Sequence, residues 1–135
     1  YPVVVINGDL MTRLNYGRLL EFHKEQGGLA TLCVKEYEHQ IPYGVVEVEQ
    51  GQVSLIDEKP SYKCFVNAGI YVLDEAVVRA VDKNRPLAMT DLLSGLVGEG
   101  GQVNVYPIHE YWLDIGRLSE YGRANKDVEL HSDNT

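Results

Sequence analysis

A short run of β-branched residues near the start of the chain, Val3 to Ile6, constrains the fold more than any other feature. The run is closed by Asn7-Gly8-Asp9, which predicts a strand buried on both faces and followed by a loop. Asn15 then favours the start of an amphipathic helix, and Gly27-Gly28 predicts its end. Because Leu29 to Val34 is again apolar and β-branched, the order strand, helix, strand predicts a crossover unit of the α/β class.

The middle of the chain has a different pattern. Residues 44–49 and 53–58 alternate between apolar and polar side chains around the turn pair Gln50-Gly51, which predicts a hairpin with one wet face. Cys64 to Leu73 predicts a longer strand, and Asp74 favours the start of a short helix after it. The other expected elements are a short helix capped by Thr90 and ended by Gly98 to Gly101, a strand over Val103 to Ile108, a helix over residues 117–128 and a polar tail over residues 129–135.

Charge and length narrow the possible partners. The chain has 135 residues, which suits one domain, and its formal net charge of −8 would repel a phosphodiester backbone. The printed residues contain neither an apolar run long enough to span a membrane nor a charged-then-apolar leader. Cys33 and Cys64 lie in apolar β-like runs, a usage typical of buried free thiols in a reducing compartment. We therefore expect a cytoplasmic protein that binds neither nucleic acid nor a membrane.

Two aspartates are the first candidates for a functional site. Asp9 follows the first predicted strand, and in open α/β sheets ligands bind at the carboxyl ends of the strands. Asp114 lies in Trp112-Leu113-Asp114-Ile115-Gly116, where an apolar stretch ends at a glycine. Each aspartate also has a plain structural interpretation, Asp9 as part of a turn and Asp114 as the cap of a following helix. If the two carboxylates converge, they suit Mg²⁺, which takes one or two protein carboxylates and completes its shell with water and substrate phosphates.

Three further segments could contact a ligand. In Glu58-Lys59-Pro60, the lysine offers a point charge for a phosphate and the glutamate can accept hydrogen bonds from hydroxyls. Tyr43-Gly44 and Asn67-Ala68-Gly69 contain small residues that let a ligand approach the backbone closely. A solvated hairpin end and ordinary turns or bulges are the structural alternatives. The 4 histidines show no metal-ligand spacing, and the sequence has none of the nucleophile motifs of hydrolases.

Five short motifs occur in a fixed order along the chain. They are residues 4–9 (Val-Val-Ile-Asn-Gly-Asp), Tyr43-Gly44, Asp57-Glu58-Lys59-Pro60, Asn67-Ala68-Gly69-Ile70-Tyr71 and Trp112-Leu113-Asp114-Ile115-Gly116. Together they resemble the sugar-phosphate nucleotidyltransferases, the family of mannose-1-phosphate guanylyltransferase and glucose-1-phosphate thymidylyltransferase, over residues 3–127. The resemblance implies a Rossmann-like α/β fold with flanking helices and a mixed, mostly parallel sheet whose one antiparallel strand is Cys64 to Leu73.

The resemblance also implies a role for each candidate residue. Such enzymes join a nucleoside triphosphate and a sugar 1-phosphate to give a nucleoside-diphosphate sugar and pyrophosphate. By position, Asp9 and Asp114 resemble the two Mg²⁺ ligands, and Lys59 resembles the cation that holds the sugar phosphate. Glu58 resembles the carboxylate that binds sugar hydroxyls. The residues that resemble the walls of the sugar pocket are Tyr43, Gly44, Asn67, Ala68 and Gly69.

One part of the family pattern does not occur in these residues. In the family, a glycine-rich loop with an arginine and a downstream lysine precedes these motifs and cradles the triphosphate. We therefore expect residues 1–128 to be the carboxyl-terminal part of a nucleotidyltransferase domain, cut from a longer protein, and the 135 residues alone to be inactive. Without neighbouring strands, the edge of Val3 to Ile6 is expected to be unpaired, which favours a homodimer or a swapped oligomer.

Other functions stay open at this point. GTP and mannose 1-phosphate are the first choice of substrates, because the repeating hexapeptides of acetyltransferase-fused relatives do not follow Asp114. One alternative is a non-catalytic module that binds a sugar phosphate. Another is a glycosyltransferase that uses a nucleotide sugar, although Asn7-Gly8-Asp9 lacks the first carboxylate of the Asp-x-Asp motif typical of such enzymes.

Overall fold

The computed structural model describes residues 1–116, so the helix and tail expected over residues 117–135 lie outside the described residues. The chain divides into two units. The first, which we name the sheet unit, comprises Tyr1–Lys35 and the described residues from Asn67 onward. The second, which we name the hairpin unit, comprises Glu36–Val66.

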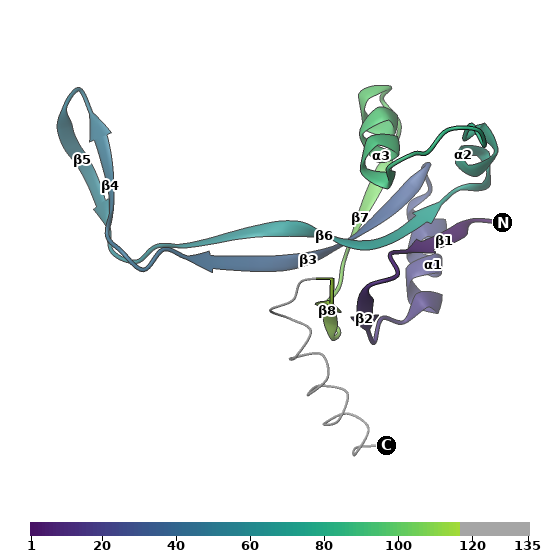
Figure 1. Cartoon of the computed structure of the whole chain (residues 1–135), viewed down its shortest axis with the longest axis horizontal. Helices are drawn as coiled ribbons and strands as arrows, with labels where there is room; N and C mark the ends of the chain where they lie inside the picture. Colours follow the sequence, from purple (N-terminus) through teal and green to yellow (C-terminus); the bar gives the residue numbers. More distant parts are fainter. Residues whose placement is uncertain (117–135) are drawn as a thin grey trace, which may run out of the picture. The chain divides into compact units, whose positions relative to one another are not determined.

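The main sheet has four strands in the order β1-β6-β3-β7 (Figure 1). The strand bounds are β1 Val3–Ile6, β6 Ser61–Leu73, β3 Ala30–Gln40 and β7 Val103–Pro107. Strands β1 and β6 are antiparallel, strands β3 and β7 are parallel, and β6 points opposite to β3 in Figure 1. The sheet is therefore mixed, as expected, and β6 is its antiparallel strand.

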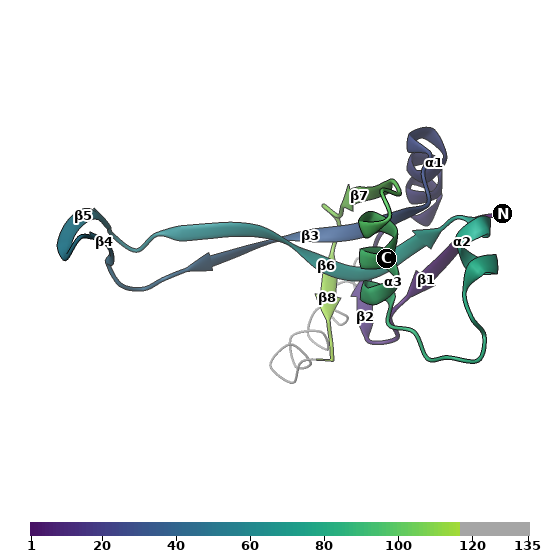
Figure 2. The same ribbon diagram turned by 90° about the horizontal axis from the view of Figure 1, so that it is seen from above.

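Helices pack on both faces of this sheet (Figures 1 and 2). Alternate residues of β6 point to opposite faces, so Ile70 joins one core cluster with Leu19 of α1 (Tyr16–Gln26). Tyr71 joins the other cluster with residues of α2 (Glu75–Ala80) and α3 (Met89–Gly98). Burial of a leucine such as Leu19, which is fully inaccessible, contributes roughly 1.5–3 kcal/mol. The class expected from the sequence, α/β, is confirmed.

Two helix starts test the expected caps. Asn15 caps α1, because its side chain accepts a hydrogen bond of 3.1 Å from the backbone N–H of Arg18. The expected cap at Thr90 is wrong. Helix α3 begins at Met89 after Ala88, whose carbonyl oxygen accepts from the N–H of Leu92 at 3.1 Å and starts the helix before the threonine.

Strand β1 differs from the expectation of a strand buried on both faces. It lies at the edge of the sheet, so Val3 and Ile6 stay 42 % and 46 % exposed. It also does not neighbour β3, because β6 lies between them. A further pair of short strands was not expected from the sequence. These are β2 (Leu10–Thr12) and β8 (Trp112–Asp114), which form a two-stranded antiparallel sheet.

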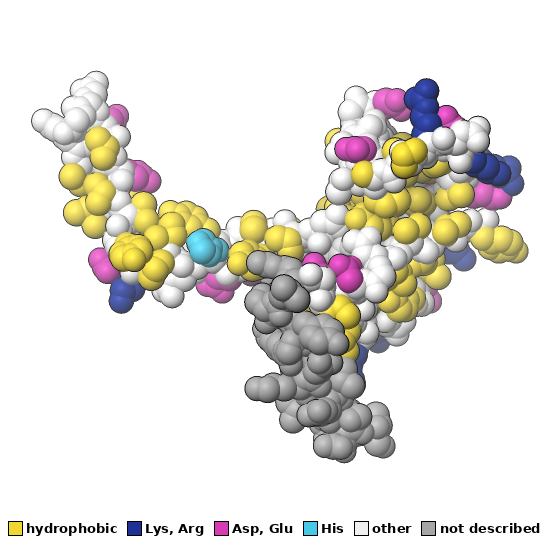
Figure 3. All heavy atoms as spheres, in the orientation of Figure 1, with side chains coloured by type: hydrophobic (Ala, Val, Ile, Leu, Met, Phe, Trp, Pro, Cys, Tyr) yellow, Lys and Arg dark blue, Asp and Glu magenta, His cyan; other side chains and the backbone are white. Residues whose placement is uncertain are grey.

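The hairpin unit contains the expected hairpin. Strands β4 (Val45–Glu49) and β5 (Gln52–Asp57) are antiparallel, and Gln50 and Gly51 form the turn with φ of 51° and 76°. The expectation of a single wet face is wrong. Apolar side chains of both strands are exposed, up to 68 % at Val48, and they gather over the hairpin in Figure 3. A two-stranded sheet has no layer of its own to cover these side chains.

The two cysteines have different environments. Cys33 of β3 is buried, and this burial, together with the nearby charge of Glu110, raises the pKa of its thiol to about 12. Cys64 is exposed, so the expectation that both thiols are buried is wrong for this residue. In the part of β6 that carries Cys64, residues on both faces of the strand are exposed, so neither face would bury its side chain. Within residues 1–116, none of the helices is long and apolar enough to cross a membrane.

Candidate functional site

The segments that carry Asp9 and Asp114 are paired with each other. In the β2·β8 sheet, Leu10 lies opposite Asp114, so the aspartate that precedes β2 and the aspartate that ends β8 meet at the same end of the ladder. The backbone N–H of Ile115 donates to the carbonyl oxygen of Asp9 at 2.9 Å. Residues more than a hundred positions apart in the sequence are therefore neighbours in space.

Gly116 shows that the two side chains border one space. A Cβ atom built on Gly116 would collide with Oδ2 of Asp9 and would lie 3.0 Å from Oδ1 of Asp114. The backbone N–H of Gly116 itself donates to Oδ1 of Asp114 at 2.9 Å. Any other residue at position 116 would fill the space between the carboxylates, which explains why a glycine follows Asp114 here.

This donor set fits a hard divalent cation. Magnesium prefers carboxylate oxygens, uses one or two of them, and keeps the remaining positions for water and substrate phosphates. Within residues 1–116 there is no group of three or more His, Cys, Asp or Glu side chains that could hold a metal ion. A magnesium site needs no third protein ligand, so the two carboxylates are compatible with one.

The Asn67-Ala68-Gly69 motif lies within β6, beside the carboxylate segments, where the backbone departs from regular strand geometry at Gly69. The side-chain oxygen of Asn67 accepts from the N–H of Gly69 at 2.8 Å, and Gly69 has a φ of +75° that side chains rarely adopt. The carbonyl of Gly69 accepts from the N–H of Asn7, and the carbonyl of Ala68 accepts from the indole N–H of Trp112. Three of the sequence motifs thus converge within the sheet unit.

The other two motifs converge within the hairpin unit. The N–H of Lys59 donates to the carbonyl oxygen of Tyr43 at 3.2 Å. A Cβ on Gly44 would lie 3.1 Å from Oε2 of Glu58, so the glycine leaves room for this carboxylate. Lys59 adopts a left-handed φ of 47°, which costs a non-glycine residue roughly 1–2 kcal/mol and marks a constrained corner of the chain.

Comparison with known proteins decides the family. A family model described as nucleotidyl transferase matches residues 1–130. The chain belongs to the nucleotidyl transferase family. A putative mannose-1-phosphate guanyltransferase of Sulfolobus acidocaldarius is 33 % identical over 129 residues, covering 93 % of this chain and 35 % of the relative. A glucose-1-phosphate adenylyltransferase of Clostridioides difficile is 28 % identical over 139 residues, covering 93 % of this chain and 36 % of the relative.

Solved structures show the same fold. HddC from Yersinia pseudotuberculosis aligns with a TM-score of 0.65 at 22 % identity, over 93 % of this chain and 55 % of HddC. A putative glucose-1-phosphate thymidylyltransferase from Bacillus anthracis aligns with a TM-score of 0.62 at 22 % identity, over 93 % of this chain and 53 % of that protein. This nucleotidyl transferase chain spans about a third of the length of the curated relatives it matches.

Sequence reasoning on this nucleotidyl transferase missed three contributors to the site. Each was seen only as part of a motif. Gly116 leaves the space between the carboxylates, Trp112 bonds the Asp114 segment to Ala68, and the backbone N–H of Asn7 bonds the Asp9 segment to Gly69. A signal for Gly116 was present, because glycine is the residue that lets another group approach the backbone closely. The sequence has no local signal for the bond between Trp112 and Ala68, because it joins positions far apart in the chain.

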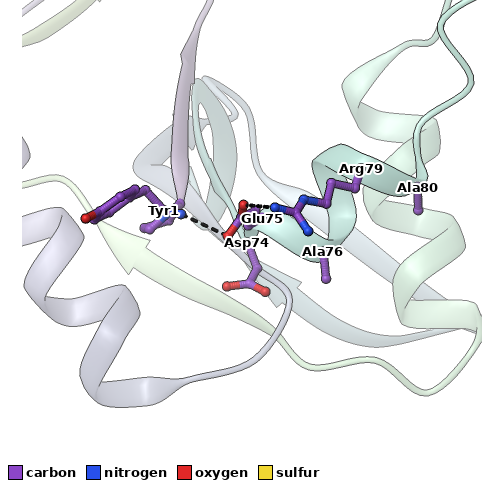
Figure 4. A pocket seen from close by; sticks show the side chains of 7 residues that line it. Tyr1, Asp74, Glu75, Ala76, Arg79 and Ala80 are labelled. Atoms are coloured by element: carbon purple, nitrogen blue, oxygen red, sulfur yellow. Dashed lines mark hydrogen bonds and ion pairs between the residues drawn. The ribbon is translucent and has the colours of Figure 1, made fainter.

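A hollow of about 600 Å³ lies elsewhere in the sheet unit (Figure 4). It is next to the start of β1, whereas Asp9 follows the end of that strand. Glu75 in this hollow pairs with Arg79 and with the amino group of Tyr1. Its cationic groups are therefore paired with a carboxylate, and the hollow offers little attraction for a phosphate. Its lining residues are Tyr1, Pro2, Asp74, Glu75, Ala76, Arg79 and Ala80.

Proposed function

We propose that this nucleotidyl transferase forms a nucleoside-diphosphate sugar and pyrophosphate from a nucleoside triphosphate and a sugar 1-phosphate. The observation that carries the proposal is the shared space of the Asp9 and Asp114 carboxylates beside Gly116. The names of the curated relatives support it, since they include a mannose-1-phosphate guanyltransferase and a glucose-1-phosphate adenylyltransferase. The family model supports the general class of transfer.

In the proposed reaction, an oxygen of the sugar phosphate attacks the α-phosphorus of the triphosphate. The bond from the α-phosphorus to the bridging oxygen breaks, and pyrophosphate leaves with the electron pair. Asp9 and Asp114 would hold Mg²⁺, which when bound neutralises phosphate charge. Such reactions depend on positioning and charge neutralisation rather than on a protein nucleophile. The carboxylates are suited to this role because backbone hydrogen bonds fix the segments that bear them.

The remaining candidate residues would hold the sugar 1-phosphate. Lys59 supplies a positive charge for the phosphate, and Glu58 accepts hydrogen bonds from sugar hydroxyls. Gly44 leaves the space into which Glu58 projects. Within the hairpin unit, the backbone around Tyr43 would form a wall for the sugar ring. For Asn67, Ala68 and Gly69 of the sheet unit, we keep the pocket-wall role that the family resemblance implies. These roles follow from the family resemblance and from the local pairing of the motifs within each unit.

We further propose GTP and mannose 1-phosphate as the substrate pair. Support comes from the guanyltransferase of Sulfolobus acidocaldarius and from a probable mannose-1-phosphate guanylyltransferase 2 of rice, which is 30 % identical over 126 residues. The test is a pyrophosphate-release assay of the full-length protein with Mg²⁺, four nucleoside triphosphates and several sugar 1-phosphates. Preferred release with GTP and mannose 1-phosphate is expected. Release with another pair would refute the substrate choice, and no release with any pair would refute the transferase.

The 135 residues alone test whether sugar 1-phosphate binding and triphosphate binding depend on different parts of the protein. We propose that they bind a sugar 1-phosphate but do not release pyrophosphate, because the family's triphosphate-binding loop is not among them. Calorimetry gives the binding and the release assay gives the turnover. Turnover by the 135 residues would contradict this proposal. Transfer from a nucleotide sugar to an acceptor would instead favour the glycosyltransferase alternative.

We also propose that the 135 residues associate through β1. This strand lies at the edge of the main sheet, and within residues 1–116 its outer side pairs with no other strand. Exposed, β-branched edges pair readily with other chains. Light scattering is expected to give the mass of a dimer that becomes a monomer in Val3→Lys, because Val3 is 42 % exposed. A monomer at every concentration would contradict the proposal.

A further inference from the structure

The two carboxylate segments are anchored to the same short stretch of β6. The carbonyl of Gly69 accepts from the backbone N–H of Asn7 at 2.9 Å, two residues before Asp9. The adjacent carbonyl of Ala68 accepts from the indole Nε1–H of Trp112 at 2.8 Å, two residues before Asp114. Each aspartate is therefore tied, through the residue two positions before it, to one of two successive carbonyls of β6.

These anchors matter because β2 and β8 alone form only a two-stranded sheet. A ladder of this size is marginally stable in water and depends on packing against other elements. The anchor of Trp112 is a side chain, half-buried and packed against the core cluster that contains Ala68. A tryptophan N–H in such a place needs an acceptor, and a fixed acceptor in turn fixes the position of the strand that carries the tryptophan.

We propose that Trp112 is a positioning residue for the cation site: its bond to Ala68 holds Asp114 beside Asp9, so that both carboxylates border the space next to Gly116. The inference rests on the proposed function, because it takes the two carboxylates as the cation ligands. Trp112 does not contact the cation in this account. It acts through Leu113 and Asp114, while Gly116 keeps the space between the carboxylates open.

The second anchor provides an independent test. A Cβ on Gly69 would lie 2.6 Å from the side-chain Nδ2 of Asn7 and 2.9 Å from Cδ1 of Leu10. Gly69→Ala therefore strains the backbone at its φ of +75° and pushes against the side chains of Asn7 and Leu10, which lie on either side of Asp9. Gly69→Ala thus disturbs the Asp9 side of the carboxylate pair, whereas loss of the Trp112 bond disturbs the Asp114 side.

The experiment measures Mn²⁺ binding by electron paramagnetic resonance, which reports cation affinity without any turnover. Trp112→Phe keeps an aromatic ring and removes the donor. Loss of one such hydrogen bond is expected to weaken Mn²⁺ binding about three- to tenfold. The matched control is Tyr106→Phe, which also removes one polar group from a side chain packed against the same core cluster. The control is expected to leave the affinity within about twofold of the original.

Two further variants, Asp9→Asn and Asp114→Asn, distinguish a failure of the positioning role from a failure of the cation site itself. If both variants lose Mn²⁺ binding and Trp112→Phe keeps it within twofold, the positioning role is wrong and the cation site stands. If neither aspartate variant changes the affinity, the proposed function loses its cation site and the positioning role is wrong with it. A purely structural tryptophan would lower the melting temperature and leave the affinity of the folded protein unchanged, which also contradicts the proposal.

A folding defect does not remove the test. If Trp112→Phe fails to fold, Gly69→Ala is measured instead, and the same loss of affinity is expected from the other anchor. Amide hydrogen exchange of Ile115, whose N–H donates to Asp9, is expected to speed up in whichever variant folds. Unchanged affinity and unchanged exchange in Gly69→Ala would overturn the proposal.

Discussion

In the sheet unit, the carboxylate segments are held by hydrogen bonds between distant parts of the chain and pack against one core cluster. In the hairpin unit, Glu58 and Lys59 follow a two-stranded sheet whose apolar side chains are exposed. The two units therefore differ in how firmly they fix their functional groups. Buried packing and long-range bonds preorganise the two carboxylates, whereas the corner at Lys59 is shaped by its left-handed φ and by hydrogen bonds within the hairpin unit, such as the one from Lys59 to Tyr43.

The two cysteines give the largest expected contrast between the units. At pH 8, the exposed Cys64 of the hairpin unit should react with a thiol reagent about 10³-fold faster than Cys33, because the raised pKa of Cys33, about 12, keeps it protonated. Ellman's reagent is expected to modify one thiol per folded chain and both thiols in denaturant. Two fast thiols in the folded chain would show that the core around Cys33 opens freely.

The same thiol predicts how stability depends on pH. The pKa of Cys33 is about 12 in the folded chain against an ordinary value of 9.0, so the unfolded chain loses this proton first. The stabilisation is thus complete below about pH 9 and is lost as the pH rises towards 12. Cys33→Ala should flatten this alkaline loss in urea titrations, and Cys64→Ala should not. Identical pH profiles for both variants would contradict the assignment.

The carboxylates of the sheet unit should dominate turnover. In the full-length protein, Asp9→Asn is expected to lower kcat about 10²–10³-fold, because it removes charge that complements the phosphates in the transition state. Steady-state kinetics at saturating Mg²⁺ measures the change. Asp91→Asn, an exposed aspartate of α3, is the matched control and should leave kcat unchanged. Near-normal turnover in Asp9→Asn would remove this residue from the site.

Apolar residues should contribute differently to stability in the two units. Leu19→Ala removes a fully buried side chain of the sheet unit and is expected to cost about 2–5 kcal/mol of unfolding free energy. Leu55→Ala removes a side chain of β5 that is 52 % exposed and should cost less than about 0.5 kcal/mol. Urea unfolding of the two variants gives the comparison. A large loss in Leu55→Ala would mean that the hairpin is covered in solution.

Backbone strain in the hairpin unit gives the smallest effect. Lys59 and Gln50 have similar left-handed φ values of 47° and 51°, so glycine at either position should raise the unfolding free energy by about 0.5–1 kcal/mol. Only Lys59→Gly also removes a charge proposed to bind phosphate. Calorimetry should therefore show weaker sugar 1-phosphate binding in Lys59→Gly and unchanged binding in Gln50→Gly. Equal binding in both variants would exclude Lys59 from the site.

The sequence allowed the local parts of the fold to be predicted. The helix that Asn15 caps and the hairpin around Gln50 and Gly51 follow from capping and turn chemistry, which act within a few residues. The unpaired edge of β1 was expected from the family resemblance, whereas the exposure of Val3 and Ile6 and the β2·β8 ladder were not predicted, because both depend on contacts between distant segments. The exposure of Cys64 was missed for the same reason, since an apolar run does not reveal whether another layer covers it.

In the candidate site, too, local features could be predicted and contacts between distant residues could not. The five motifs could be listed from the sequence, and the structure shows that they meet in two groups, one in each unit. The resemblance to a known family supplied the role of each residue, which neither spacing nor composition indicates. The anchor from Trp112 to Ala68 and the space that Gly116 leaves became visible only in three dimensions.

The shared cation site of Asp9 and Asp114 is the claim that the rest of the account needs. Crystals soaked in MnCl₂ test it most directly, because manganese gives an anomalous signal and can occupy magnesium sites. We predict one anomalous peak coordinated by carboxylate oxygens of both aspartates, in the space beside Gly116. A peak that touches only one aspartate, or no peak in this space, would contradict the account.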